Sequence, residues 1–392
     1  MRLAELANPQ GIFGRPCRGD PLDCPAMRTD ALDYHLPDDL IATQAAEPRD
    51  SARLLLVRRE SQTIEHHRVC DLPSLGIFEP GDLMLVNQTR VLPAQLAGIR
   101  ANTGGRISGL FVEADRNKRW RVMLESRGTL MPGETIRLKS VEESVKPAEL
   151  ELIDSLGNGE WLAQLQDDDE TAAVLNRLGQ TPLPPYIRKQ RKKLGQGEIT
   201  DADQDRYNTV YAQAPGSVAA PTAGLHFTPG LLDALDQLGV HRAAVDLHVG
   251  LGTFAPVRSE HLEDHEMHHE SYTVPRATLD AITAARANGN RLLIIGTTTV
   301  RALESLPDNA LDPSAYPEGI TTSTNLFIRP DTGFQFRYTD RLMTNFHLPQ
   351  STLLALVAAL PGIGLDRLIE IYQEAVAQRY RFYSYGDAML IV

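Results

Sequence analysis

Residues 215–254 constrain the fold most, because they place two loops rich in glycine and threonine, each with a histidine, around one short helix and one strand. Thr228 can cap a helix that begins at Pro229, and Gly239 can end that helix. The strand that follows ends near His248. A chain with this pattern is expected to form an α/β domain with a polar site at one edge of its sheet.

The two loops have the features of a ligand site. Glycines let a backbone approach a ligand closely, and prolines fix turns. His226 would lie just before the N-terminus of the helix, and His248 near the carboxyl end of a strand, where open α/β sheets bind their ligands. Either loop alone could be an ordinary turn, but the pair favours a site, whose other candidate residues are Thr222, Gly224, Gly250, Gly252 and Thr253.

After residue 229, helices and strands alternate along the chain. Such alternation predicts βαβ units and a mixed, largely parallel sheet. The expected helices are 277–287, 298–306, 353–360 and 366–377, and the expected strands include 53–57, 81–90, 291–296 and 388–392.

Residues 91–166 have a different texture, because short strand-like runs alternate there with turns rich in Gly, Asn and Asp. That spacing predicts a small antiparallel barrel. Since 392 residues exceed one ordinary core, we predict an α/β catalytic domain of residues 27–90 and 167–392 with an inserted β-barrel domain of residues 91–166. Residues 1–26 are expected to be a disordered extension or a mis-assigned start.

A formal net charge of -12 argues against a surface that coats nucleic acid broadly, but it leaves room for one local basic patch. The run that follows Pro182 is such a patch, with one aromatic residue that could stack on a base. A solvated face is the equally weighted alternative. The candidate residues are Tyr186, Arg188, Lys189, Arg191, Lys192 and Lys193.

Three cysteines, two of them in the first residues, predict neither a disulfide framework nor a structural zinc site. No apolar run is long enough to span a membrane, and no secretory signal is recognisable. The sequence therefore indicates a cytoplasmic protein.

The segment from His265 to His269 matches the H-E-x-x-H zinc signature, which needs both histidines on one helix. Residues 271–275 follow at once and have the pattern of a strand that ends in proline. We therefore expect no metal site. A metal-dependent hydrolase that uses His265, Glu266 and His269 stays open as an alternative.

Three further polar segments are candidate sites. One, at a strand-to-helix turn, contains Thr298 and Arg301, a suitable place for a carboxylate or phosphate. The others contain Asn345 with His347, and Arg381 with Tyr385 and Asp387. Neither a dinucleotide-binding glycine fingerprint, nor a P-loop, nor a Gly-x-Ser-x-Gly elbow is present in the sequence.

Together these residues resemble one family, the S-adenosylmethionine:tRNA ribosyltransferase-isomerases of queuosine biosynthesis. The resemblance runs from about Asp33 to the C-terminus, and its most specific segments are 219–228, 247–254, 344–349 and 380–391. It implies an α/β domain with an inserted β-barrel. It also implies that the ribose of S-adenosylmethionine moves onto the aminomethyl-deazaguanine base of a tRNA anticodon, giving epoxyqueuosine, adenine and methionine.

The resemblance implies a site without metal, in which S-adenosylmethionine is a co-substrate and its sulfonium acidifies the neighbouring ribose carbon. A base of ordinary strength then suffices. His226 is the first candidate, because the following helix start favours a neutral imidazole. The other catalytic candidates are His248, His347 and Asp387. The partner is precursor-bearing tRNA, which the basic run is expected to bind, and we expect a monomer with no obligate protein partner and no membrane.

Three positions depart from the family pattern. Gln88 and Asn325 stand where the family has aspartate, so neither position can supply a catalytic acid here. His269 stands where the family has serine, which makes the H-E-x-x-H match look accidental. A non-catalytic tRNA-binding protein that uses the basic run and the barrel is a third interpretation.

Overall fold

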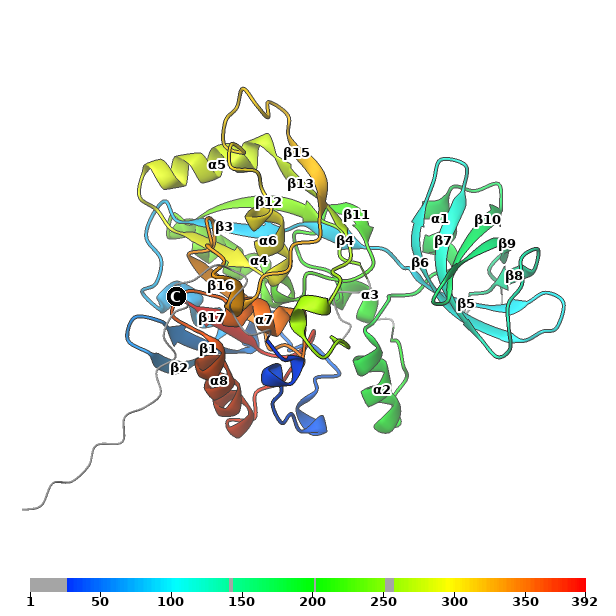
Figure 1. The fold of residues 1–392 in the computed structure, drawn as a ribbon, viewed down its shortest axis with the longest axis horizontal. Helices are drawn as coiled ribbons and strands as arrows, with labels where there is room; N and C mark the ends of the chain where they lie inside the picture. The colour runs from blue at the N-terminus through cyan, green and yellow to red at the C-terminus, as the bar shows by residue number, and fades with distance from the viewer. Residues whose placement is uncertain (1–26, 141–143, 201, 251–256) are drawn as a thin grey trace, which may run out of the picture.

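The computed structural model describes residues 27–140, 144–200, 202–250 and 257–392. The predicted N-terminal extension, residues 1–26, lies outside the described residues, as do Gly252 and Thr253. A larger α/β part holds most of the chain, and a barrel stands to one side of it (Figure 1).

The centre of the larger part is a nine-stranded mixed sheet, which confirms the predicted fold class. Parallel pairing holds for the four adjacent strands β12, β3, β14 and β16, whereas both outer regions contain antiparallel pairs. In spatial order the strands are β15 (Gly319–Thr324), β13 (Glu270–Pro275), β12 (His241–Leu247), β3 (Leu83–Asn87), β14 (Leu292–Ile295), β16 (Arg341–Asn345), β17 (Ala388–Ile391), β1 (Arg53–Arg58) and β2 (Thr63–Arg68).

Both faces of this sheet are buried, as the residues of β3 show. Successive side chains of a strand point to opposite faces. Leu83 and Leu85 join one core cluster, while Met84 and Val86 join another. The first cluster includes side chains of α5 (Arg276–Ala287), α6 (Thr297–Glu304), α7 (Thr352–Ala358) and α8 (Leu365–Ala377). The second includes side chains of α4 (Pro229–Gln237) and of the 3-10 helix η5 (Val69–Ser74).

The second part is a closed antiparallel barrel whose apolar interior contains Trp120 and Trp161. Helix α1 (Thr171–Leu178) adds Val174, Leu175 and Leu178 to that interior. The first strand was not anticipated from the sequence, and the domain boundaries at residues 91 and 166 stay a prediction. The strands are β5 (Gln95–Arg100), β6 (Arg106–Ala114), β7 (Arg119–Ser126), β8 (Thr135–Leu138), β9 (Ala148–Gly157) and β10 (Glu160–Gln166).

Short elements connect the two parts. β4 (Thr89–Val91) pairs in parallel with β11 (Ala214–Ser217). The basic run forms a helix, α2 (Pro185–Lys193), with Pro185 in its first turn, where a missing amide hydrogen costs nothing. The remaining helices are α3 (Ala202–Arg206), η2 (Thr29–Leu32), η3 (Asp38–Leu40), η4 (Arg49–Ser51), η6 (Thr222–His226), η8 (Leu262–Asp264) and η9 (Pro330–Thr332).

No helix in the described part of the chain combines the length and the apolar character that crossing a membrane requires.

Candidate active site

The carboxyl ends of the four central parallel strands bring polar residues to one edge of the sheet. His248 follows β12, Asn87 ends β3, Thr297 and Thr298 follow β14, and Asn345 ends β16. Because these strands are parallel, their carboxyl ends meet at the same edge, which is the edge where such sheets bind ligands.

The two loops predicted to form a site do meet. Ser217 Oγ accepts a hydrogen bond from the amide of Val249 at 2.9 Å and donates to the carbonyl of Ala219 at 2.7 Å. Gly216 packs so closely on His248 that a Cβ at this glycine would lie 2.3 Å from the imidazole Cε1. The His248 imidazole therefore packs directly on the backbone of Gly216, and His248 is partly exposed, with Nδ1 3.5 Å from Thr89 Oγ1.

A pocket opens between η6, the start of α6 and the end of β16. Its walls include Thr222, Thr298 and Asn345, which the sequence had named as substrate-binding candidates. The other polar groups in the walls belong to threonine, serine, tyrosine and His347, and the described lining contains no lysine, arginine, aspartate or glutamate. The arrangement suits a neutral part of a ligand.

Asn345 is the most informative residue of this pocket. Its side-chain amide Nδ2 donates to the carbonyl of Tyr383 at 3.1 Å and to His226 Nε2 at 3.2 Å. Asn345 is 3% exposed, and its Oδ1 is buried with no hydrogen-bond partner. A buried acceptor of this kind is costly unless a ligand satisfies it.

His226 and His347 are both buried and neutral near pH 7. Burial lowers the pKa of His226 to about 4, against the opposing field of Asp387, and lowers the pKa of His347 to about 3. His226 lies just before α4, as predicted, but burial rather than the helix start is the main cause of its neutrality. Its Nε2 already accepts from Asn345, and His347 Nε2 lies 2.9 Å from Thr344 Oγ1.

A buried ion pair lies behind the second loop. Arg301 and Glu270 each have side chains about 3% exposed and are joined through Nη1 and Oε2. Glu270 Oε1 accepts from the amide of Gly250 at 3.0 Å, and Arg301 Nε donates to the carbonyl of Leu326 at 3.2 Å. Most of the Arg301 guanidinium is thus committed to the protein, although its Nη2 has no partner.

Glu270 was missed by sequence reasoning. A signal was present, because strand β13 buries every second residue and Glu270 occupies one of those buried positions, in line with Tyr272 and Val274. A carboxylate in such a position needs a partner. Asn87 was missed as well, and it binds the backbone of Leu247 through both of its amide atoms.

Asp387 does not suit the predicted catalytic role. Its side chain is 1% exposed and pairs with Arg381 at 2.9 Å. It also accepts from the backbone amides of Arg53 and Arg381, so its lone pairs are engaged within the protein. Asp387 and Arg381 therefore form a structural clamp on the turn before β17, and neither faces the pocket.

Arg191 and Tyr385 are also structural, contrary to the prediction. Arg191 makes a bidentate pair with Asp203, with Nη1 to Oδ2 at 2.6 Å and Nη2 to Oδ1 at 2.8 Å, and both side chains are 3% exposed. Tyr385 donates to Asp203 Oδ1 at 2.8 Å. This buried network anchors α2 to Asp203 and to the carbonyl of Thr43, and it leaves the Arg191 guanidinium inaccessible to a phosphate.

The other residues of the basic run divide into two groups. Tyr186 faces the pocket, with its hydroxyl 2.6 Å from Ser384 Oγ and its ring centroid 4.6 Å from that of Tyr383. Its ring therefore faces the pocket and not the outer surface of α2. The outward residues are Arg188, paired with Glu198, Lys193, paired with Asp38, and the exposed Lys189 and Lys192.

Packing alone requires a glycine at position 224, because a Cβ there would lie 2.2 Å from the hydroxyl oxygen of Tyr211. The assignment of Gly224 as a substrate-binding residue stays a prediction.

The H-E-x-x-H segment has no helical structure. The 3-10 helix η8 ends at Asp264, strand β13 begins at Glu270, and residues 265–269 between them are irregular. The signature therefore lacks the helix that would put two histidines on one face. Within the described residues, no group of three or more His, Cys, Asp or Glu side chains is arranged to hold a metal ion.

Known proteins are similar to this chain over nearly its whole length. The family model for a queuosine biosynthesis protein matches residues 29–391. The S-adenosylmethionine:tRNA ribosyltransferase-isomerase of Gloeobacter violaceus is 43% identical over 372 residues, which cover 95% of this chain and 98% of that protein. The protein of the same name from an Anaeromyxobacter species is 44% identical over 369 residues, covering 93% and 99%.

One solved structure is also similar. It is the crystal structure of the S-adenosylmethionine tRNA ribosyltransferase of Thermotoga maritima, which is 32% identical, with coverage of 92% of this chain and 100% of that one and a TM-score of 0.48.

Proposed function

This chain belongs to the queuosine biosynthesis family of S-adenosylmethionine:tRNA ribosyltransferase-isomerases and is an enzyme of that class; from this premise we propose its substrates and its reaction. It moves the ribose of S-adenosylmethionine onto the aminomethyl-deazaguanine base of a tRNA anticodon. The ribose rearranges during transfer, and adenine and methionine leave. The product is epoxyqueuosine in tRNA.

The observation that carries this proposal is the row of polar groups along the carboxyl ends of β12, β3, β14 and β16. It offers hydroxyls, amides and imidazoles without a charged side chain in the pocket. Such a site suits proton transfers on a substrate that is already activated, and the sulfonium of S-adenosylmethionine supplies that activation.

His248 is the best candidate for the general base. The sequence places His226 first, but His226 is buried, its pKa is lowered to about 4, and its Nε2 accepts from Asn345. A general base works best with a pKa near the working pH and with a free lone pair. His248 is partly exposed just after β12, and its ring packs directly on the backbone of Gly216.

Glu270 and Arg301 are positioning residues in this proposal. Their pair fixes the amide of Gly250, two residues beyond His248. The backbone is therefore fixed at Gly250, and this limits the movement of the proposed base at His248.

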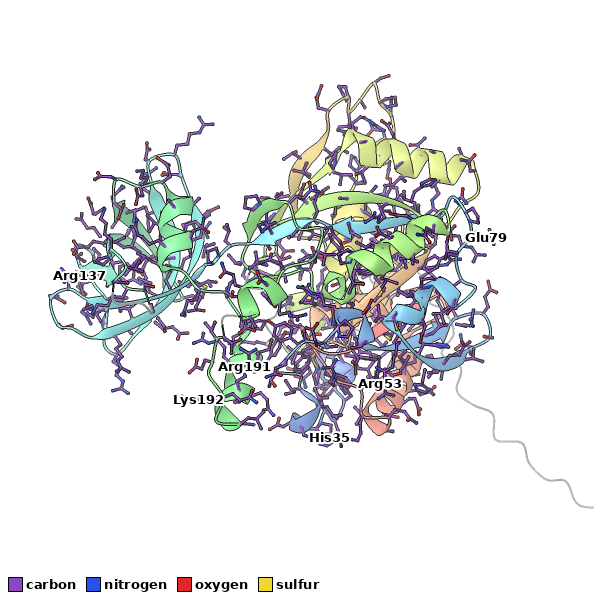
Figure 2. The ribbon with its side chains drawn as sticks, turned by 180° about the vertical axis from the view of Figure 1, so that it is seen from behind. His35, Arg53, Glu79, Arg137, Arg191 and Lys192 are labelled. Carbon is purple, nitrogen blue, oxygen red and sulfur yellow. The ribbon has the colours of Figure 1, made fainter. Side chains whose placement is uncertain are left out.

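The tRNA is held in part by the outer face of α2. Lys189 and Lys192 are exposed there, Lys193 forms an exposed pair that a phosphate can replace, and Arg188, 31% exposed, pairs with Glu198 and contacts Gln95 Oε1 at 3.4 Å. Figure 2 places Lys192 on the outer side of this helix. The inner face of α2 carries Tyr186 to the pocket, so one helix serves both substrates.

The test is mass analysis of nucleosides from precursor-bearing tRNA after incubation with this protein and S-adenosylmethionine. We expect the aminomethyl-deazaguanine nucleoside to be replaced by the heavier epoxyqueuosine nucleoside, with adenine released in equal amount. Adenine release without a modified nucleoside, or no change in either, contradicts the proposal.

A further inference from the structure

We propose that the pocket between η6, the start of α6 and the end of β16 binds the adenine of S-adenosylmethionine, with the adenine 6-amino group donating to Asn345 Oδ1. This inference rests on the proposed function. It adds which part of S-adenosylmethionine binds at each end of the site.

The first argument is charge. The described lining of the pocket has no ionised side chain, and His347 in its wall is neutral. An ionised group moved into such surroundings loses its hydration without gaining a counter-charge. The ammonium, carboxylate and sulfonium of the methionyl part therefore belong outside the pocket, and so does the cationic aminomethyl group of the deazaguanine.

The second argument is the unpaired acceptor. Asn345 Oδ1 is buried and has no partner, although Asn345 makes two other hydrogen bonds. The amide cannot turn over to relieve this, because its Nδ2 must face the carbonyl of Tyr383, which can only accept. The vacant position therefore calls for a donor from the ligand, and the 6-amino group of adenine is a neutral donor.

The third argument is the shape of the walls. Tyr186 and Tyr383 present aromatic rings to the pocket from two different segments, and the backbone near Gly296, Ala220 and Ala223 carries only small side chains. Aromatic rings stack on any purine, which gives affinity without hydrogen-bond selectivity. Selectivity for adenine over other purines then depends on Asn345.

This placement also orders the rest of the substrate. With adenine at the end of β16, the ribose extends along the strand ends toward β3 and β12, where Asn87 and His248 lie. The reacting carbon and the proposed base are then on the same side of the adenine.

The experiment compares inhibition by adenine, a product of the proposed reaction, with inhibition by purine, which lacks the 6-amino group. In the unmodified enzyme adenine should inhibit about tenfold or more strongly, since a lost bond to a buried acceptor leaves that acceptor unpaired. In Asn345→Leu the ratio should fall to near one. In the control Ser384→Ala, which also alters the pocket, the ratio should be kept.

Equal inhibition by adenine and purine in the unmodified enzyme overturns the inference, even if Asn345→Leu fails to fold. It would mean that the acceptor meets a ribose hydroxyl or the deazaguanine. Failure of the proposed function is separate, because it is seen as absence of adenine release and of nucleoside modification in the unmodified enzyme.

Discussion

The barrel and the edge of the sheet bury different kinds of side chain. The barrel interior is apolar, built around Trp120 and Trp161, and the 2% exposed carboxylate of Asp167, just after the last barrel strand, is paired with Arg177. The carboxyl edge of the sheet instead buries His226, Asn345 and Arg301. Buried polar groups cost free energy unless they are paired. Their concentration at one edge is the physical reason for proposing that the chemistry takes place there.

Substitutions of two glycines, one at the sheet edge and one in the barrel, test whether the first region acts in catalysis and the second in stability. The largest effect is expected from Gly216→Ala, because the added Cβ would displace the His248 imidazole. An imidazole can move, so the fold should survive. We expect turnover to fall by about 10²–10⁴-fold, the usual contribution of a general base. Steady-state kinetics measure this, and Gly230→Ala is the control because its Cβ would meet nothing within 4 Å. Unchanged turnover in Gly216→Ala would show that His248 is not the base.

Acid should weaken the sheet edge before the barrel. In the unfolded chain both histidines bind a proton below about pH 6.5. In the folded protein burial lowers the pKa of His226 to about 4 and that of His347 to about 3, so both stay neutral at pH 5. Stability is therefore complete above pH 6.5 and is lost as pH falls toward 4. The His226 shift alone corresponds to about 3 kcal/mol. Hydrogen exchange at pH 7 and pH 5 should show loss of protection in β16 but not in β7, and equal loss in both would contradict the distinction.

In the barrel the corresponding glycine is Gly109. A Cβ there would lie 2.6 Å from the carbonyl oxygen of Met123 and from a Leu124 methyl group. Backbone cannot yield as a side chain does, so Gly109→Ala should lower the free energy of unfolding by about 1–3 kcal/mol. Denaturant unfolding measures the loss. Affinity for S-adenosylmethionine should be kept, and a large loss of that affinity would place the barrel within the site.

The smallest effect is on the salt dependence of tRNA binding. Replacing Lys189 and Lys192 with glutamine should reduce the slope of log affinity against log salt by about one per lysine, since each lost phosphate contact removes about one unit. The matched control is Lys139→Gln on the barrel, an exposed lysine. Equal slopes for both variants would leave α2 as a solvated surface.

Sequence patterns predicted most of the fold because local rules decide it. The turns between short strands identified the barrel, and the cap at Thr228 and the proline at 229 placed α4 correctly. The sequence failed where a long-range partner decides the role of a residue. Arg191 looks like any other member of the basic run, and only Asp203, twelve residues later, makes it structural.

The site was predicted in part for the same reason. Two histidine loops close in sequence were found, and Thr222, Thr298 and Asn345 do line one pocket. Tyr186 and Asp387 were assigned by residue type, and their contacts with Ser384 and Arg381 could not be read from spacing. Glu270 was hidden beside the misleading zinc signature, although its place in an alternating strand was visible.

The most direct test is the single-turnover rate at which precursor in tRNA becomes the modified nucleoside, compared between His248→Asn and His226→Gln. If the base stands at the end of β12, His248→Asn lowers this rate by about 10²–10⁴-fold, whereas His226→Gln changes it by less than about tenfold, because the glutamine amide oxygen reaches the position of Nε2 and can still accept from Asn345. A near-normal rate in His248→Asn, with the large loss in His226→Gln, would contradict this and place the base at His226, beside Asn345.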